Sequence, residues 1–184
     1  NLPFNGDDEF ARLHAAIRAL LPIMPALAAS SPLIDGATSR SLDNRMAVYA
    51  RNARSIASVA GEVIPEPVWS HAEYQRVILD RIYADLKPHD PEGTLAHEWC
   101  NSRGCIARFS RNTIEVRVLD VQECPAADLA VLKLIGATLE WLSEKRSPHQ
   151  SALRALPTSR LRAILDLTID GADTAIISDA SYLA

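Results

Sequence analysis

Cysteine is scarce in this sequence, and the few residues present are poorly placed for cross-linking. Cys100, Cys105 and Cys124 are the three cysteines of the 184-residue chain, and no two form a C-x-x-C pair. An odd, sparse set is a poor disulfide framework and a poor ligand set for zinc. We therefore expect ordinary packing roles for these thiols, in a protein of the reducing cytoplasm.

Long apolar runs are also missing. Residues 20–29 are apolar, but the run is short, and Pro22 and Pro25 interrupt it. A membrane-spanning helix needs about 20 apolar residues, so we predict a buried or bent helix here and no membrane partner. No charged leader precedes an apolar run, as it would in a cleavable signal. The chain opens at Asn1 without an initiator Met, and we expect a truncated or processed start.

Positive charge is not in excess. The chain has 19 Lys and Arg against 23 Asp and Glu, for a net charge of −4, and it has no strongly basic stretch. A dedicated nucleic-acid binder would present a Lys/Arg-rich face, so we expect no nucleic-acid partner. A nucleotide ligand stays open, because it needs only a few placed arginines. Apolar residues make up 48% of the chain, enough for the core of one domain.

The apolar periodicity predicts helices with a few strands embedded among them, an α+β fold. Turn residues predict a loop over 33–44, and the pattern over 45–61 is ambiguous. A capping box formed by Ser70 and Glu73 marks one helix start. The predicted helices cover residues 7–29, 70–86, 125–142 and 158–169; the predicted strands cover 105–109 and 113–119.

The second strand carries an acid and a base on one face. Successive side chains point to opposite faces of a strand, so Glu115 and Arg117 share a face with Thr113. Hairpin partners lie within side-chain reach, which brings Arg108 of the preceding strand close to that face. The opposite face should meet the core through Ile114, Val116 and Val118.

Arginine is concentrated around this hairpin, where Arg103 and Arg111 join Arg108 and Arg117. The guanidinium group binds two oxygens through a planar fork and keeps its charge. A carboxylate can hold Mg²⁺ between phosphate oxygens. Such a face suits phosphoryl transfer, in which charge must be stabilised on the transferred group. The alternative is a solvated face whose surface ion pair contributes little.

Several stretches of the chain together form a pattern typical of one family. The hairpin reads NSRGCIARF at 101–109, TIEVRVLD at 113–120 and QECP at 122–125. The opening NLPF with DDEF at 7–10, and SSPL at 30–33 with DG at 35–36, extend the pattern. From Asn1 to about Trp141 the chain resembles the glutamate–cysteine ligase family 2, which includes the bacterial carboxylate–amine ligases.

The resemblance implies a fold and a reaction. The fold would be like that of glutamine synthetase and the guanidino kinases, with a curved antiparallel sheet whose concave face carries the active site. The reaction would be phosphorylation of a carboxylate by ATP, with Mg²⁺ or Mn²⁺, and attack of an amine on the acyl phosphate. Glutamate and cysteine would be the substrates, as in glutathione biosynthesis, and a homo-oligomer is compatible with the family. A guanidino-kinase-like phosphotransferase and an inactive structural fragment are the alternatives.

The resemblance also implies roles for residues of the hairpin. Glu115 matches a metal ligand, and Arg117 matches a phosphate-binding, catalytic arginine two residues later. Arg103 or Arg108 would contact the nucleotide phosphate or the acyl phosphate, and the sequence does not choose between them.

Substrate binding is assigned more loosely. Arg45 lies in the loop where relatives place a substrate-binding arginine, and Arg40 is equally near. The loop after Gly36 departs from the pattern of the well-known ligases, which leaves both substrates open. Family members carry further metal-binding glutamates on an N-terminal strand, and a histidine-bearing strand just before the point matched by Asn1. We therefore expect residues 1–184 to be a single domain, the C-terminal part of a catalytic domain without those strands.

Overall fold

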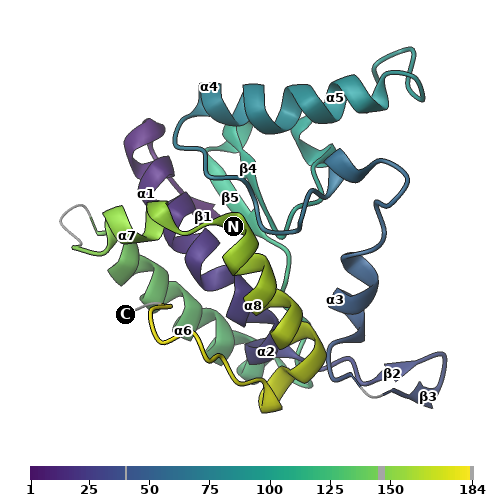
Figure 1. The fold of residues 1–184 in the computed structure, drawn as a ribbon, viewed down its shortest axis with the longest axis vertical. Helices are drawn as coiled ribbons and strands as arrows, with labels where there is room; N and C mark the ends of the chain where they lie inside the picture. Colours follow the sequence, from purple (N-terminus) through teal and green to yellow (C-terminus); the bar gives the residue numbers. More distant parts are fainter. Residues whose placement is uncertain (40, 145–147, 183–184) are drawn as a thin grey trace.

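The computed structural model describes residues 1–39, 41–144 and 148–182. Helices dominate, and two small antiparallel sheets are set among them (Figure 1), which confirms the α+β class. The elements in chain order are β1 (Leu2–Pro3), α1 (Gly6–Leu20), α2 (Met24–Ala28), β2 (Leu33–Ile34), β3 (Ala37–Thr38), α3 (Asn44–Tyr49), α4 (His71–Tyr74), α5 (Asp80–Leu86), β4 (Cys105–Arg108), β5 (Thr113–Val116), α6 (Pro125–Ser143), α7 (Gln150–Ala155) and α8 (Thr158–Gly171).

The larger sheet has three antiparallel strands in the order β1-β5-β4. In the predicted hairpin, Arg108 of β4 lies opposite Thr113 of β5. β5 ends at Val116, whereas the alternation predicted a strand to residue 119. The pairing ends at Val116 because β4 begins only at Cys105. One further hydrogen bond lies beyond the paired strands, from the Arg117 amide to the Gly104 carbonyl at 2.8 Å.

α1 is the central helix. α6 and α7 pack against it, and α8 packs against α2 and against the turn that joins α1 to α2 (Figure 1). The predicted helix over 7–29 is present as α1, a 3₁₀ turn at Leu21–Ile23 and α2. Pro22 and Pro25 lie in the first turns of the last two pieces, where a missing N–H costs nothing. The stretch Gly6–Ala28 is long and apolar enough to cross a membrane, but 78% of its 18-residue apolar window is buried inside the fold, as in a core helix.

The segment predicted as a loop over 33–44 contains a small hairpin instead. β2 and β3 pair across a turn in which Asp35 and Gly36 have φ of 51° and 79°. Aspartate and glycine tolerate this left-handed conformation, which matches the twist of a two-residue hairpin. Figure 1 shows this hairpin projecting from one corner of the molecule, close to α3.

Aromatic rings form the part of the core beneath the larger sheet. Phe10 of α1 lies 5.0 Å from Phe109 and 6.0 Å from Tyr74, measured between ring centroids. His14, one turn further along α1, stacks on Phe10 at 5.1 Å. Burial, assisted by the charge of Arg18, lowers the pKa of His14 to about 3. The imidazole is therefore neutral at cellular pH and serves as a packing group of the core.

The capping box predicted at the start of α4 is present in modified form. The Glu73 amide donates to the Ser70 hydroxyl at 3.1 Å, while the Glu73 carboxylate accepts from the Trp69 amide at 2.6 Å. A π-helical turn, Gln75–Leu79, then joins α4 to α5. The cap and the turn together place Tyr74 against the outer edge of β4.

The Tyr74 hydroxyl provides the hydrogen-bond acceptor for N–H groups at that edge. It accepts from the Ala107 amide at 3.0 Å and from the Asn101 side-chain amide at 2.7 Å, and all three residues are buried.

Tyr74→Phe should lower the free energy of unfolding by roughly 2–3 kcal/mol, because two buried N–H groups lose their acceptor. Urea unfolding measures the effect. Tyr83→Phe is the matched control, since that hydroxyl has no hydrogen-bond partner in the part of the chain that the structure describes, and equal losses in both variants would contradict the assignment.

Candidate functional site

The polar face of the hairpin brings three of the predicted residues together. The Arg117 Nε donates to one Glu115 oxygen at 2.9 Å, and the Arg108 Nη1 donates to the other at 3.4 Å. The Arg108 Nε also lies 3.8 Å from a Glu98 carboxylate oxygen. We call Glu98, Arg108, Glu115 and Arg117 the sheet-face cluster. Its side chains are partly exposed, whereas Ile114 on the opposite face is fully buried, which confirms the predicted two-faced strand.

Arg103 is not part of the cluster. Its guanidinium is buried and makes two hydrogen bonds of 2.6 Å to the Glu66 carboxylate. The remaining Nη1 donates to the Ser58 carbonyl and to the Asn101 side-chain oxygen, each at 3.0 Å. All three nitrogens of the group are therefore occupied within the protein. The guanidinium borders a cavity of about 380 Å³ that is distinct from the sheet-face cluster.

Gly61 makes room for this buried arginine. The residue has φ of 54°, and a Cβ atom at this position would lie 2.9 Å from the Arg103 Nη2. Contacts this short do not occur between a real Cβ and a neighbour, so a side chain here would displace the guanidinium. The close approach therefore requires glycine at this position, and the positive φ also favours it.

Asn101 connects the buried ion pair to the sheet-face cluster. Its side-chain oxygen accepts from Arg103, and its backbone carbonyl accepts from the Arg117 Nη1 at 3.1 Å. Arg117 is thereby held from two sides, by Glu115 and by the Asn101 carbonyl. The chain Glu66–Arg103–Asn101–Arg117 is continuous; its two middle residues are buried and its two ends are partly exposed.

Arg45 reaches from α3 to the segment that follows β5. Its guanidinium forms an ion pair with Asp120 and donates to the Arg117 carbonyl at 3.1 Å. Asp43 caps the helix, accepting from the Met46 amide at 2.8 Å, and so sets where Arg45 emerges. The Arg45 Nη2 is buried without a hydrogen-bond partner among the described residues. The other predicted substrate-binding residue, Arg40, lies outside the described residues.

A pocket of about 330 Å³ adjoins this region and has Tyr49, Ile56, Val59 and Ser102 among its lining residues. The Tyr49 hydroxyl donates to the Arg103 carbonyl at 3.3 Å. Burial raises the pKa of Tyr49, and the nearby Arg117 opposes that shift. Tyr49 and Glu66 escaped the sequence analysis, because neither belongs to a motif and each meets its partner only across more than 35 residues of chain.

The cluster does not by itself fit a divalent metal. Both Glu115 oxygens accept from guanidinium groups, which repel a cation. Nowhere in residues 1–39, 41–144 and 148–182 do three His, Cys, Asp or Glu side chains come together as a metal site. Mg²⁺ takes about six oxygen ligands, so Glu115 could supply only one of several. The predicted role of Glu115 as a metal ligand stays a prediction.

Comparison with known proteins places the chain in a family. The sequence model of glutamate–cysteine ligase family 2 matches residues 1–167. The chain therefore belongs to this family, as the hairpin motif predicted. It is also similar to an uncharacterized protein of Archaeoglobus fulgidus, with 41% identity over 139 residues. That match covers 76% of this chain and 37% of the relative, so the chain spans little more than a third of the relative's length. No solved structure matches the chain.

Removing the Glu66 carboxylate should destabilise the fold strongly. Glu66→Ala leaves the buried Arg103 charge without its partner, and we expect a loss of roughly 3 kcal/mol. Chemical denaturation measures the loss. Asp166→Ala is the matched control, because it removes an exposed helical ion pair with Arg162 and should cost less than about 0.5 kcal/mol. Similar small losses in both variants would mean that the buried pair is dispensable.

The Asp43 carboxyl should make stability depend on pH. Burial raises its pKa to about 6, from an ordinary value of 3.8. The folded protein thus holds this proton to a higher pH than the unfolded chain, so the carboxyl's contribution to stability falls as pH rises from about 4 to 6. Asp43→Asn removes this contribution. The difference in unfolding free energy between wild type and variant should change across that window, and a flat difference would contradict the shift.

Proposed function

We propose that this chain supplies the phosphate-binding face of an ATP-dependent carboxylate–amine ligase. The observation that carries the proposal is the pair of guanidinium groups, Arg108 and Arg117, held on either side of Glu115 on one face of the hairpin. Membership of the family supports a ligase of this general kind. We propose glutamate and an amine such as cysteine as substrates, with ATP as phosphoryl donor, in the cytoplasm and without a nucleic-acid or membrane partner.

In this proposal Arg108 and Arg117 bind oxygens of the transferring phosphoryl group. Both are poised for this, since each already binds a carboxylate oxygen that a phosphate oxygen can replace. The Arg108 Nε makes no hydrogen bond among the described residues, and its nearest charged partner is a Glu98 oxygen 3.8 Å away, so Arg108 is less fully committed within the protein than Arg103. Glu115 keeps the two guanidinium groups oriented before phosphate arrives. Fixed positive charges of this kind stabilise the charge that develops during transfer.

Arg103 takes a different part in the proposal. Its nitrogens are committed to Glu66, Ser58 and Asn101, which favours Arg108 for the phosphate contact. We propose that Arg103 positions Arg117 through the Asn101 carbonyl. Arg45 holds the end of the strand through Asp120, and its unpartnered Nη2 supports a contact to the substrate carboxylate. Arg40 remains the second candidate for that contact.

A divalent metal remains part of the proposal, with most of its ligands drawn from elsewhere. Because the cluster does not fit Mg²⁺ or Mn²⁺ by itself, the ion would need oxygens from ATP, from water and from carboxylates beyond the described residues. The contacts proposed above for the arginine side chains do not depend on this metal ion.

Replacing Arg117 tests the proposal. In the enzyme that carries this chain, Arg117→Ala should reduce turnover about 10²–10³-fold, as expected for loss of one charge-stabilising donor. Its unfolding free energy should fall far less than that of Glu66→Ala, because Arg117 is partly exposed. ADP release that depends on both the carboxylate and the amine substrate measures turnover. Arg111→Ala is the matched control, since this exposed arginine lies in the turn of the same hairpin.

The outcomes separate the candidate functions. ADP release that requires the amine and yields an amide supports the ligase. Formation of a phosphorylated guanidine instead would favour the guanidino-kinase-like alternative. Unchanged turnover in Arg117→Ala, or no metal-dependent nucleotide binding, would overturn the proposed site and favour a purely structural role for the hairpin.

A further inference from the structure

The pocket of about 330 Å³ that Tyr49 lines lies next to the sheet-face cluster. Tyr49 is the last residue of α3, and its hydroxyl donates to the Arg103 carbonyl at 3.3 Å. Ser102 also lines the pocket, and it directly follows Asn101, whose carbonyl accepts from the Arg117 Nη1 at 3.1 Å. The pocket is therefore a neighbour of the guanidinium to which we assign the transferring phosphoryl group.

The lining of this pocket is uncharged. Among the described residues that line it, none carries a charged side chain at neutral pH, whereas the cavity beside Arg103 is lined by two acids and two arginines. A charged group entering the pocket would lose water without gaining an ion-pair partner, which is strongly unfavourable. The pocket therefore suits an uncharged group. Apart from Tyr49 and Ser102, its lining residues are Asn52, Ala53, Ser55, Ile56, Val59 and Ala60.

The volume of the pocket indicates how large that group is. Small-molecule sites in proteins have volumes of about 300–1,000 Å³, and this pocket falls at the lower end of that range. A methylene with a thiol, as in the side chain of cysteine, would leave most of the space to water. A branched aliphatic or aromatic group would fill it better, and each further apolar group that is buried adds to the affinity.

The chemistry identifies which substrate carries this group. The proposed acid, glutamate, is charged at both ends, and its carboxylates are assigned to Arg45 and to the face that carries Arg117. The adenine of ATP is separated from the transferred phosphoryl group by two phosphates and a ribose. The amine, in contrast, must bring its nitrogen within about 3–3.5 Å of the acyl carbon. The substituent on that nitrogen is thus the uncharged group nearest to the reacting atoms.

We infer that this pocket binds the side chain of the amine substrate, and that it selects an amine whose side chain is uncharged and larger than that of cysteine. The inference rests on the proposed ligase function and refines its amine. In the reaction, the nitrogen bonds to the acyl carbon, the bond from that carbon to the phosphate oxygen breaks, and inorganic phosphate leaves with the proton from nitrogen. The pocket residues hold the amine in reach of the acyl carbon and take no part in these bond changes.

A series of amines tests the selectivity in the enzyme that carries this chain. Measured by amine-dependent ADP release, kcat/KM should be about tenfold or more higher for leucine than for alanine, whose methyl group leaves the pocket nearly empty. It should be about 100-fold or more higher for leucine than for aspartate, which is similar in size but charged. Equal values for leucine and alanine, or a preference for aspartate, would overturn the inference while the ligase stands. No amine-dependent release with any of these amines, cysteine included, would overturn the ligase and the inference together.

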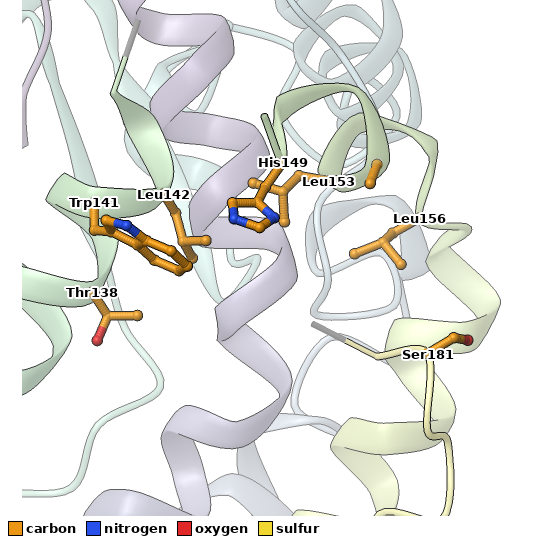
Figure 2. Close-up of a pocket in the computed structure, with 8 residues that line it drawn as sticks. Thr138, Trp141, Leu142, His149, Leu153, Leu156 and Ser181 are labelled. Carbon is orange, nitrogen blue, oxygen red and sulfur yellow. The ribbon is translucent and has the colours of Figure 1, made fainter. Parts of the chain in front are cut away.

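Filling the pocket tests its location. Ala53→Phe should raise the KM for leucine about tenfold or more and leave the KM for ATP within about twofold, because Ala53 lines the pocket and is not part of the arginine cluster. Ala152→Phe is the matched control and should change neither value. That exposed alanine lines a different pocket, of about 100 Å³, which Figure 2 shows with Trp141 and His149. An equal rise in both KM values for Ala53→Phe would assign the pocket to the nucleotide and overturn the inference.

A variant that gains a substrate keeps the test valid if Ala53→Phe does not fold. Ser55 lines the pocket and is exposed, so the fold can accept a carboxylate there. Ser55→Asp should lower kcat/KM for leucine about tenfold and raise it for free arginine by a similar factor, because a guanidinium keeps its charge and pairs with the new carboxylate. Ser151→Asp, at an exposed serine of α7, is the control and should leave both values unchanged. No gain for arginine in Ser55→Asp would overturn the inference.

Discussion

The ion pair between Arg103 and Glu66 is the interaction on which the rest of the site depends. It ties the irregular segment before α4 to the residues that lead into β4. A buried charge is tolerated only when it is paired and its hydrogen bonds are satisfied, and here every guanidinium nitrogen has a partner. Through Asn101, the same group fixes the carbonyl that orients Arg117. The geometry of the sheet-face cluster thus depends on the buried guanidinium of Arg103.

Local pattern predicted the parts of the structure that depend on neighbours in sequence. The alternation from Thr113 to Val118 gave the correct face to Glu115 and Arg117, and the hairpin brought Arg108 beside them. The four helical stretches predicted from apolar spacing have boundaries close to those observed, whereas α7 was not predicted and α3 lies largely in the stretch whose pattern was ambiguous. The family was identified from the hairpin motif, because the residues that carry it lie within 25 positions of one another.

Contacts between distant segments could not be predicted in the same way. Arg103 was grouped with Arg108 because they are close in sequence, but Glu66, 37 residues away, holds it in the core. Arg45 meets Asp120 across 75 residues, and no local pattern links the two. Which of several arginines is free for a ligand is decided by such partners. Side-chain type and spacing predict that an anion site exists, and only the folded contacts decide its members.

The position of Glu115 between Arg108 and Arg117 has a consequence for selectivity. A carboxylate already neutralises part of the positive charge, so an incoming anion must displace it before it gains both guanidinium groups. A singly charged anion would exchange one such contact for another and gain little. A polyphosphate carries several charged oxygens and can outcompete the internal carboxylate at both arginines. In the proposed site, Glu115 would thereby act as an internal competitor, and a polyphosphate would be favoured over a singly charged anion.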